Sequence, residues 1–148
     1  MKLLVAVDFS AASEVVIAAA AEVARYTGGH VYLIHVVPGE PDFVGYDAGP
    51  DTVRHQLAVE VVAEHRQLQA EAQALRDRGL EATALLLQGY PAEIVLREAS
   101  RLEAGLIVIG SHGHGAVYDL LIGSVSEQLI RRSTLPVLVV PIRASKAN

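Results

Sequence analysis

Residues 106–115 read LIVIGSHGHG, and this stretch decides the fold that the sequence predicts. Its first four residues are all apolar and branched, which is typical of a strand buried on both faces. The glycines that follow, Gly110, Gly113 and Gly115, let the backbone turn sharply and let its N–H groups converge on a ligand without a Cβ in the way. A buried strand, a glycine-rich loop and a helix start is a common arrangement for holding phosphate, so we expect a nucleotide-binding site here.

Apolar strands and amphipathic helices alternate along the rest of the chain. Further strands are predicted at residues 3–7, 30–37, 80–87 and 136–140. Helices are predicted at 10–26, 51–78, 92–102 and 124–132, with Ser10 and Asp51 as N-caps and Pro91 at a first helical position. In the longest of these helices one apolar stripe predicts the buried face: Val53, Leu57, Val61, Leu68, Ala72 and Leu75.

This alternation predicts an α/β fold: a doubly wound, five-stranded, mainly parallel sheet with helices on both faces. With 148 residues, 51% of them hydrophobic, we expect one domain over 1–148. We assume the strand order 3-2-1-4-5, in which ligands bind between the first and fourth strands. Those two strands lead into Asp8 and Gly110, the chemically most distinctive strand ends of the sequence, so the assumed order and the predicted site support each other.

The charge and composition narrow the range of partners. A net charge of −5 argues against nucleic acid and anionic membrane surfaces, because both attract a positive field. The chain has no cysteine, which excludes disulfides and thiolate chemistry and is compatible with a reducing compartment. No apolar run approaches the roughly 20 residues that a transmembrane helix needs. Asp8 ends the first apolar run too early for a secretory signal, so we expect a cytoplasmic protein.

The last predicted strand, Pro136 to Val140, raises the question of a partner. In the assumed order it lies at an edge of the sheet, yet it carries no charge to discourage pairing. Antiparallel pairing with the same strand of a second copy would cover this edge and give a two-fold homodimer. The alternative is an internal strand that needs no partner.

The glycine spacing, Gly110-x2-Gly113-x9-Gly123-Ser124, resembles the ATP-binding motif of the universal stress protein family. The resemblance extends over nearly the whole chain, through LVAVD at 4–8, LIHVV at 33–37, the segment around Gly89 and the strand that ends before Pro141. It implies a dimeric, ATP-binding stress-response regulator that holds ATP, ADP or AMP together with magnesium. It also implies a protein partner, which the sequence does not identify.

The resemblance implies a set of nucleotide contacts at the ends of three strands and at the start of the last helix: Asp8, Val36, Gly110, Gly113, Gly123, Ser124 and Val125. Asp8 would approach the ribose or a bound metal, and the backbone of Val36 would read the adenine edge. Gly110 would border the ribose and Gly113 would approach the phosphates. Gly123, Ser124 and Val125 would offer backbone N–H groups, and Ser124 its hydroxyl, to the phosphates.

Simpler roles compete with these assignments. Ser124-Val125-Ser126-Glu127 has the pattern of a capping box, so Ser124 could serve only to cap a helix. Asp8 and the glycines could only form turns. His112 and His114 are more typical of solvated loop residues than of a metal site, because no third ligand is evident.

The sequence also bears on how the predicted site would meet phosphate charge and on whether it catalyses a reaction. His114 is a possible phosphate contact, since many family members carry a basic residue at its position and no lysine or arginine lies between Gly110 and Gln128. No set of catalytic residues is evident, so an ATP-consuming enzyme, by slow hydrolysis or adenylyl transfer, is the less favoured alternative. A dimerisation module without nucleotide is the third reading.

Overall fold

The computed structural model describes residues 1–39, 51–112 and 122–143, and for residues 51–58 the backbone alone. Its strands are β1 (Lys2–Ala6), β2 (His30–Val37), β3 (Glu81–Gln88), β4 (Leu106–Gly110) and β5 (Val137–Val140). They form one sheet in the order β3-β2-β1-β4-β5, and every pair of neighbours is parallel. The structure therefore confirms the predicted fold class and strand order.

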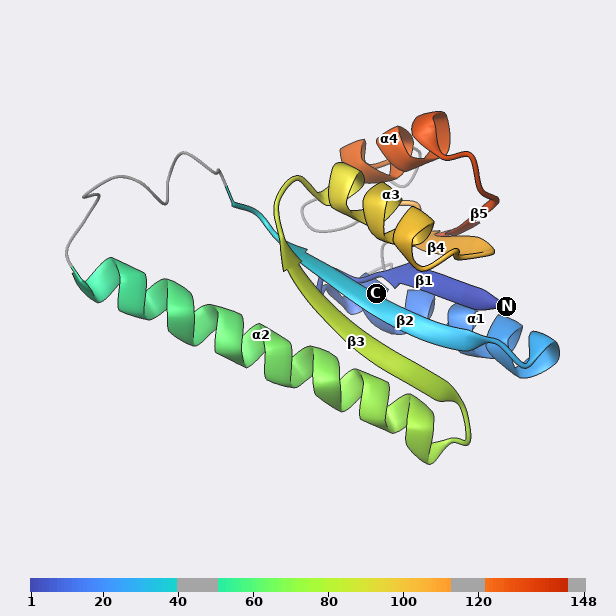
Figure 1. Ribbon diagram of the computed structural model, residues 1–148, viewed down its shortest axis with the longest axis horizontal. Helices are drawn as coiled ribbons and strands as arrows, with labels where there is room; N and C mark the ends of the chain where they lie inside the picture. The colour runs from blue at the N-terminus through green and yellow to red at the C-terminus, as the bar shows by residue number, and fades with distance from the viewer. Residues whose placement is uncertain (40–50, 113–121, 144–148) are drawn as a thin grey trace, which may run out of the picture.

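Helices cover both faces of this sheet (Figure 1). The helices α1 (Ala11–Thr27) and α2 (Asp51–Asp77) pack on one face, and α3 (Pro91–Arg101) and α4 (Ser124–Arg132) pack on the other. Each face has its own apolar core, with Leu3, Val5 and Leu33 in the first and Leu4, Ile34 and Ile107 in the second. Within the described residues, none of these helices is long and apolar enough to cross a bilayer.

Helix α2 is the longest helix that the structure describes, and it is only partly packed on the sheet. Leu68, Ala72 and Leu75 of the predicted stripe are buried, as expected. The prediction that Val61 is buried is wrong: this side chain is 36% exposed, because the first half of α2 projects past the end of the sheet (Figure 1). The side chains of Val53 and Leu57 lie outside the described residues. The helix begins at Asp51 itself.

Ser10 is the N-cap residue of α1, as predicted, whereas the start of α4 differs from its predicted cap. Ser10 precedes α1, but its side chain makes no capping bond and donates instead to Oδ1 of Asp8 at 2.6 Å. The capping-box prediction for α4 is wrong, because Gly123 is the N-cap and Ser124 is the first helical residue, without a side-chain cap. The hydroxyl of Ser124 is therefore not engaged in holding the helix start.

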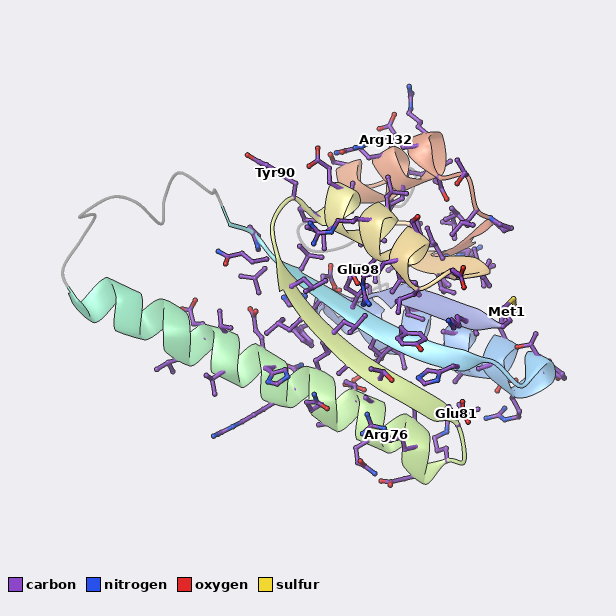
Figure 2. All side chains as sticks on the ribbon, viewed as in Figure 1. Met1, Arg76, Glu81, Tyr90, Glu98 and Arg132 are labelled. Atoms are coloured by element: carbon purple, nitrogen blue, oxygen red, sulfur yellow. The ribbon has the colours of Figure 1, made fainter. Side chains whose placement is uncertain are left out.

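Helix α3 starts as the sequence predicts, with Pro91 in its first turn. Tyr90 precedes it and projects away from the protein (Figure 2). Further along, Glu98 is 5% exposed and accepts a hydrogen bond from Nε of Arg101 at 2.7 Å. This bond and the charge of the Glu98 carboxylate raise the pKa of the exposed Arg101 guanidinium. The pair belongs to the structure of α3 and lies outside the cavity described next.

Candidate functional site

A cavity of about 520 Å³ lies at the carboxyl ends of β1, β2 and β4, between these strand ends and α4. Six of the predicted site residues line it: Asp8, Val36, Gly110, Gly123, Ser124 and Val125. They come from four separate segments of the chain. Gly113 and His114 lie outside the described residues. The cavity is therefore at the crevice where the strand order reverses, as the sheet topology predicts.

Asp8 is fixed by the turn between β1 and α1. Its Oδ1 accepts hydrogen bonds from the backbone N–H of Ser10 at 3.0 Å and from the hydroxyl of Ser13 at 3.0 Å. The next residue, Phe9, has a φ of 61°, a conformation that non-glycine residues adopt only when the surrounding structure holds them there. The carboxylate is thus positioned by a strained turn and two serines, more firmly than an ordinary surface turn requires.

The backbone of Val36 faces the cavity. The carbonyl of Ile34 accepts the N–H of Val7 at 2.9 Å, so the backbone groups of Ile34 point towards β1. Residues two apart in a strand point the same way, and β1 ends at Ala6, so the N–H and carbonyl of Val36 point to the space above the end of β1. Such an edge can recognise a flat heterocycle through paired donor and acceptor groups.

The end of β4 and the start of α4 are tied together across the other side of the cavity. The N–H of Gly123 donates to the carbonyl of Ser111 at 2.8 Å, and the hydroxyl of Ser126 donates to the carbonyl of Gly110 at 2.8 Å. A Cβ on Gly110 would lie 3.1 Å from the carbonyl oxygen of His112 and 3.2 Å from the side chain of Ile142, so a side chain at Gly110 would push these atoms away. The two hydrogen bonds therefore hold the start of α4 beside the end of β4, at the edge of the cavity.

Few of the side chains that line the cavity are charged or titratable. Asp8, His35 and His112 line it, and none of the described lining residues is a lysine or arginine. His112 is only 8% exposed, so the expectation of a solvated side chain at this position is wrong. Its Nδ1 lies 3.4 Å from the hydroxyl of Ser111. In the described part of the chain, no three His, Asp or Glu side chains are grouped to hold a metal ion.

Several lining residues were not singled out from the sequence. Ser13 and His35 hold the end of β1, and Ser126 holds the end of β4. Ser13 follows Asp8 by five residues and Ser126 follows Gly123 by three, and this closeness in the sequence is a signal that spacing could have provided. His35 stands within a mainly apolar strand, where a polar residue is itself a signal.

Comparison with known proteins agrees with this fold. The universal stress protein family matches residues 1–141 of the chain. A universal stress protein of Thermus aquaticus is 34% identical over 138 residues, which cover 93% of this chain and 96% of the relative. The solved structure of MJ0577 from Methanocaldococcus jannaschii matches with a TM-score of 0.81 at 26% identity, over 97% of both chains. A universal stress protein from Archaeoglobus fulgidus, solved in complex with dAMP, matches with a TM-score of 0.68 at 27% identity, over 94% of this chain and 96% of that one.

Proposed function

The chain belongs to the universal stress protein family, and from this premise we propose that it binds an adenine nucleotide in the cavity above β1 and β4. We further propose that it acts as a homodimeric stress-response regulator in the cytoplasm. The observation that carries the proposal is the convergence of six residues from four segments on one cavity. The dAMP complex of the Archaeoglobus fulgidus protein supports an adenine nucleotide as the ligand class.

The chemistry around the cavity suits the three parts of a nucleotide. The backbone edge of Val36 offers a donor and an acceptor to adenine, and the apolar side chains of Val95 and Ile109 line the same space. Asp8 and Gly110 line the same cavity, and we propose that they border the ribose. The volume of about 520 Å³ lies within the range of pockets that hold small ligands.

The start of α4 suits the phosphates. A helix N-terminus presents unpaired N–H groups and the positive end of the helix dipole, and Gly123, Ser124 and Val125 line the cavity there. The Ser124 hydroxyl makes no capping bond and is available as a further donor. Because no described lining residue is a lysine or arginine, we propose that magnesium neutralises the charge of a di- or triphosphate, with Asp8 near the ion. This predicts a stronger magnesium requirement for ATP than for AMP.

The homodimer is proposed to form through β5. The carbonyls of Pro136 and Val140 accept bonds from the N–H groups of Ile107 and Ser111, so this side of the strand faces β4. The backbone groups of Val137 and Val139 point the opposite way, away from the sheet, where a second copy could pair with them. The unpaired edge of an uncharged strand is the reason to expect such a partner.

Calorimetric titration tests the nucleotide proposal. Purified protein is titrated with ATP, ADP and AMP, with and without magnesium, beside the variant Gly123→Val. Gly123 has φ −63° and ψ 156°, which valine adopts readily, so the substitution adds bulk at the phosphate position without straining the backbone. We expect binding by the wild type and a loss of at least tenfold in affinity for the variant, with unchanged circular dichroism. Absence of binding to all three nucleotides at millimolar concentration would refute the proposal.

A further inference from the structure

His35 joins two parts of the protein that the proposed nucleotide site does not otherwise connect. The residue is 9% exposed, and its Nδ1 lies 2.8 Å from the carbonyl oxygen of Val7, directly before Asp8. Its Nε2 lies 3.2 Å from Oε2 of Glu64, on α2. One imidazole ring therefore bridges the end of β1 and the long helix.

The two contacts differ in the number of protons that they require on the ring. A carbonyl oxygen only accepts hydrogen bonds, so Nδ1 must carry a proton to bond Val7. A carboxylate also only accepts, so Nε2 can bond Glu64 only if it carries a second proton. Oε2 of Glu64 is buried and has no hydrogen-bond partner in the described part of the chain, so its 3.2 Å contact with Nε2 of His35 is an ion-pair distance that a second ring proton would turn into a hydrogen bond. The bridge is therefore complete with an imidazolium and broken with a neutral ring, whose Nε2 lone pair would face the carboxylate.

Glu64 stands where α2 meets the body of the protein. All side chains at positions 59–63 are exposed, Glu64 is the first that is half-buried, and Leu68 is the first that is fully buried. Figure 1 shows the preceding part of the helix extending past the sheet. Among the α2 side chains that the structure describes, which start at position 59, Glu64 thus makes the first polar contact with the sheet, one turn before the buried Leu68.

The other end of the bridge acts on the proposed site. The register of β1 with β2 ends at the pair Ala6 and Ile34, and the Val7 carbonyl lies just beyond it. Instead of continuing the ladder, this carbonyl is in hydrogen-bond contact with Nδ1 of His35. The His35 ring also lies against the ring of Phe9, with centroids 4.4 Å apart, and Phe9 is the residue with the strained φ. A shift of His35 would therefore move both neighbours of Asp8.

We propose that His35 and Glu64 form a proton-dependent latch, in which an imidazolium ties α2 to the end of β1 and positions Asp8 for the nucleotide. The part that concerns nucleotide rests on the proposed function, whereas the latch itself does not. His35 is a positioning residue in this scheme.

The other titratable groups around the latch are mainly carboxylates. Asp8 and His112 line the large cavity with His35. Glu14 of α1 and Glu71 of α2 line a smaller cavity of about 130 Å³, which Phe9 also lines. On α2 itself, His65 follows Glu64 and is exposed. No lysine or arginine is among the described residues that line either cavity, so the surroundings supply negative charge to an imidazolium.

Substitution of Glu64 separates the latch from a general effect of charge. In Glu64→Gln, the new amide can donate to the bare Nε2 of a neutral ring and can accept from an imidazolium, so the bridge forms in both states. Glu64→Ala forms it in neither. Glu60→Gln, one turn earlier on an exposed position, removes the same charge without touching His35 and is the matched control. His65→Asn removes the neighbouring imidazole ring.

Amide hydrogen exchange in the ligand-free protein tests the latch. Protection of residues 59–66 is measured from pH 5.5 to 8, the range in which histidine ordinarily titrates, and is corrected for intrinsic exchange. The wild type, Glu60→Gln and His65→Asn should all lose at least threefold in protection as the pH rises. Glu64→Gln should stay protected throughout, and Glu64→Ala should be poorly protected throughout. Protection of the wild type that does not change with pH, or an equal pH dependence in Glu64→Gln, would overturn the latch.

Nucleotide affinity at pH 6 and pH 8 tests the positioning of Asp8. The terminal phosphate of the ligand also titrates in this range, so the ratio between wild type and Glu64→Gln is the deciding quantity. We expect the wild type to lose at least threefold more affinity than Glu64→Gln on going to pH 8. Equal losses would overturn the positioning role. Absence of binding at any pH would refute the proposed function, while the exchange experiment would still decide on the latch.

Discussion

Two serines two positions apart on α4 lead to opposite predictions. Ser126 is 8% exposed, and its hydroxyl donates to the carbonyl of Gly110 at 2.8 Å. Ser124 is exposed, and its hydroxyl lies 3.4 Å from the amide nitrogen of Gln128, at the long end of hydrogen-bond distances. Serine-to-alanine substitution removes the same hydroxyl in both cases, so any difference must come from the surroundings.

The structure sets the expected magnitudes for stability. Ser126→Ala removes a buried hydrogen bond and leaves the Gly110 carbonyl without this donor, which costs about 1–2 kcal/mol of unfolding free energy. In a chain of this size, such a loss lowers Tm by about 3–7 °C. Ser124→Ala should change the free energy of unfolding by less than about 0.5 kcal/mol, because the side chain is exposed and alanine is the better helix former.

The expected order reverses for nucleotide affinity. Ser124→Ala should weaken ATP binding about threefold to tenfold, because it removes a proposed hydroxyl contact to phosphate worth about 1 kcal/mol. Thermal unfolding followed by circular dichroism and calorimetric titration of both variants give the two measurements. If Ser126→Ala leaves Tm within about 1 °C of the wild type, the role of its hydroxyl in holding the end of β4 is wrong. If Ser124→Ala leaves affinity unchanged, the phosphate assignment at α4 is wrong.

Two further predictions concern α2 and β5. Leu68→Ala should lower the free energy of unfolding, measured in urea, by about 2–5 kcal/mol, because the Leu68 side chain is fully buried. Val61→Ala should change this free energy by less than about 0.5 kcal/mol, because the Val61 side chain is exposed on the half of α2 that the sheet does not cover. Comparable losses for both variants would contradict the partial packing of α2. Val139→Pro removes a backbone N–H that points away from β4, so it should break pairing with a second copy without breaking the sheet. In analytical ultracentrifugation the variant should sediment as a monomer, with its far-ultraviolet circular dichroism unchanged. A variant that remains dimeric would argue against pairing through β5.

The sequence predicted the strands and helices well because each is bounded by strong local signals. Strand β2 was predicted at its observed bounds, since an apolar run lies between Gly29 and Pro38. The strand order was assumed for a doubly wound sheet and is observed. Glycine spacing and strand ends also brought the candidate site together, because the carboxyl ends of parallel strands meet at one edge of the sheet.

The failed predictions depend on tertiary contacts that local patterns do not contain. The apolar stripe on α2 continues through Val61, but this part of the helix extends past the end of the sheet, so nothing in the sheet buries the Val61 side chain. Ser124 has the spacing of a capping box, yet the backbone turns one residue earlier, at Gly123. His112 looks like a loop residue in the sequence, yet its side chain is 8% exposed and lines the cavity. The bridge from His35 to Glu64 joins residues that no sequence spacing relates.

The pairing of β1 with β4 aligns Leu3 with Leu106, so the two walls of the cavity come from distant parts of the sequence. Any opening that separates these strands splits the proposed site into halves that cannot hold a ligand. A bound nucleotide would therefore act as a non-covalent crosslink between the two halves of the chain. At a concentration one hundred times its Kd, it would add about 2.7 kcal/mol to the free energy of unfolding. Resistance to proteolysis would then report the nucleotide level around the protein, without any change in its shape.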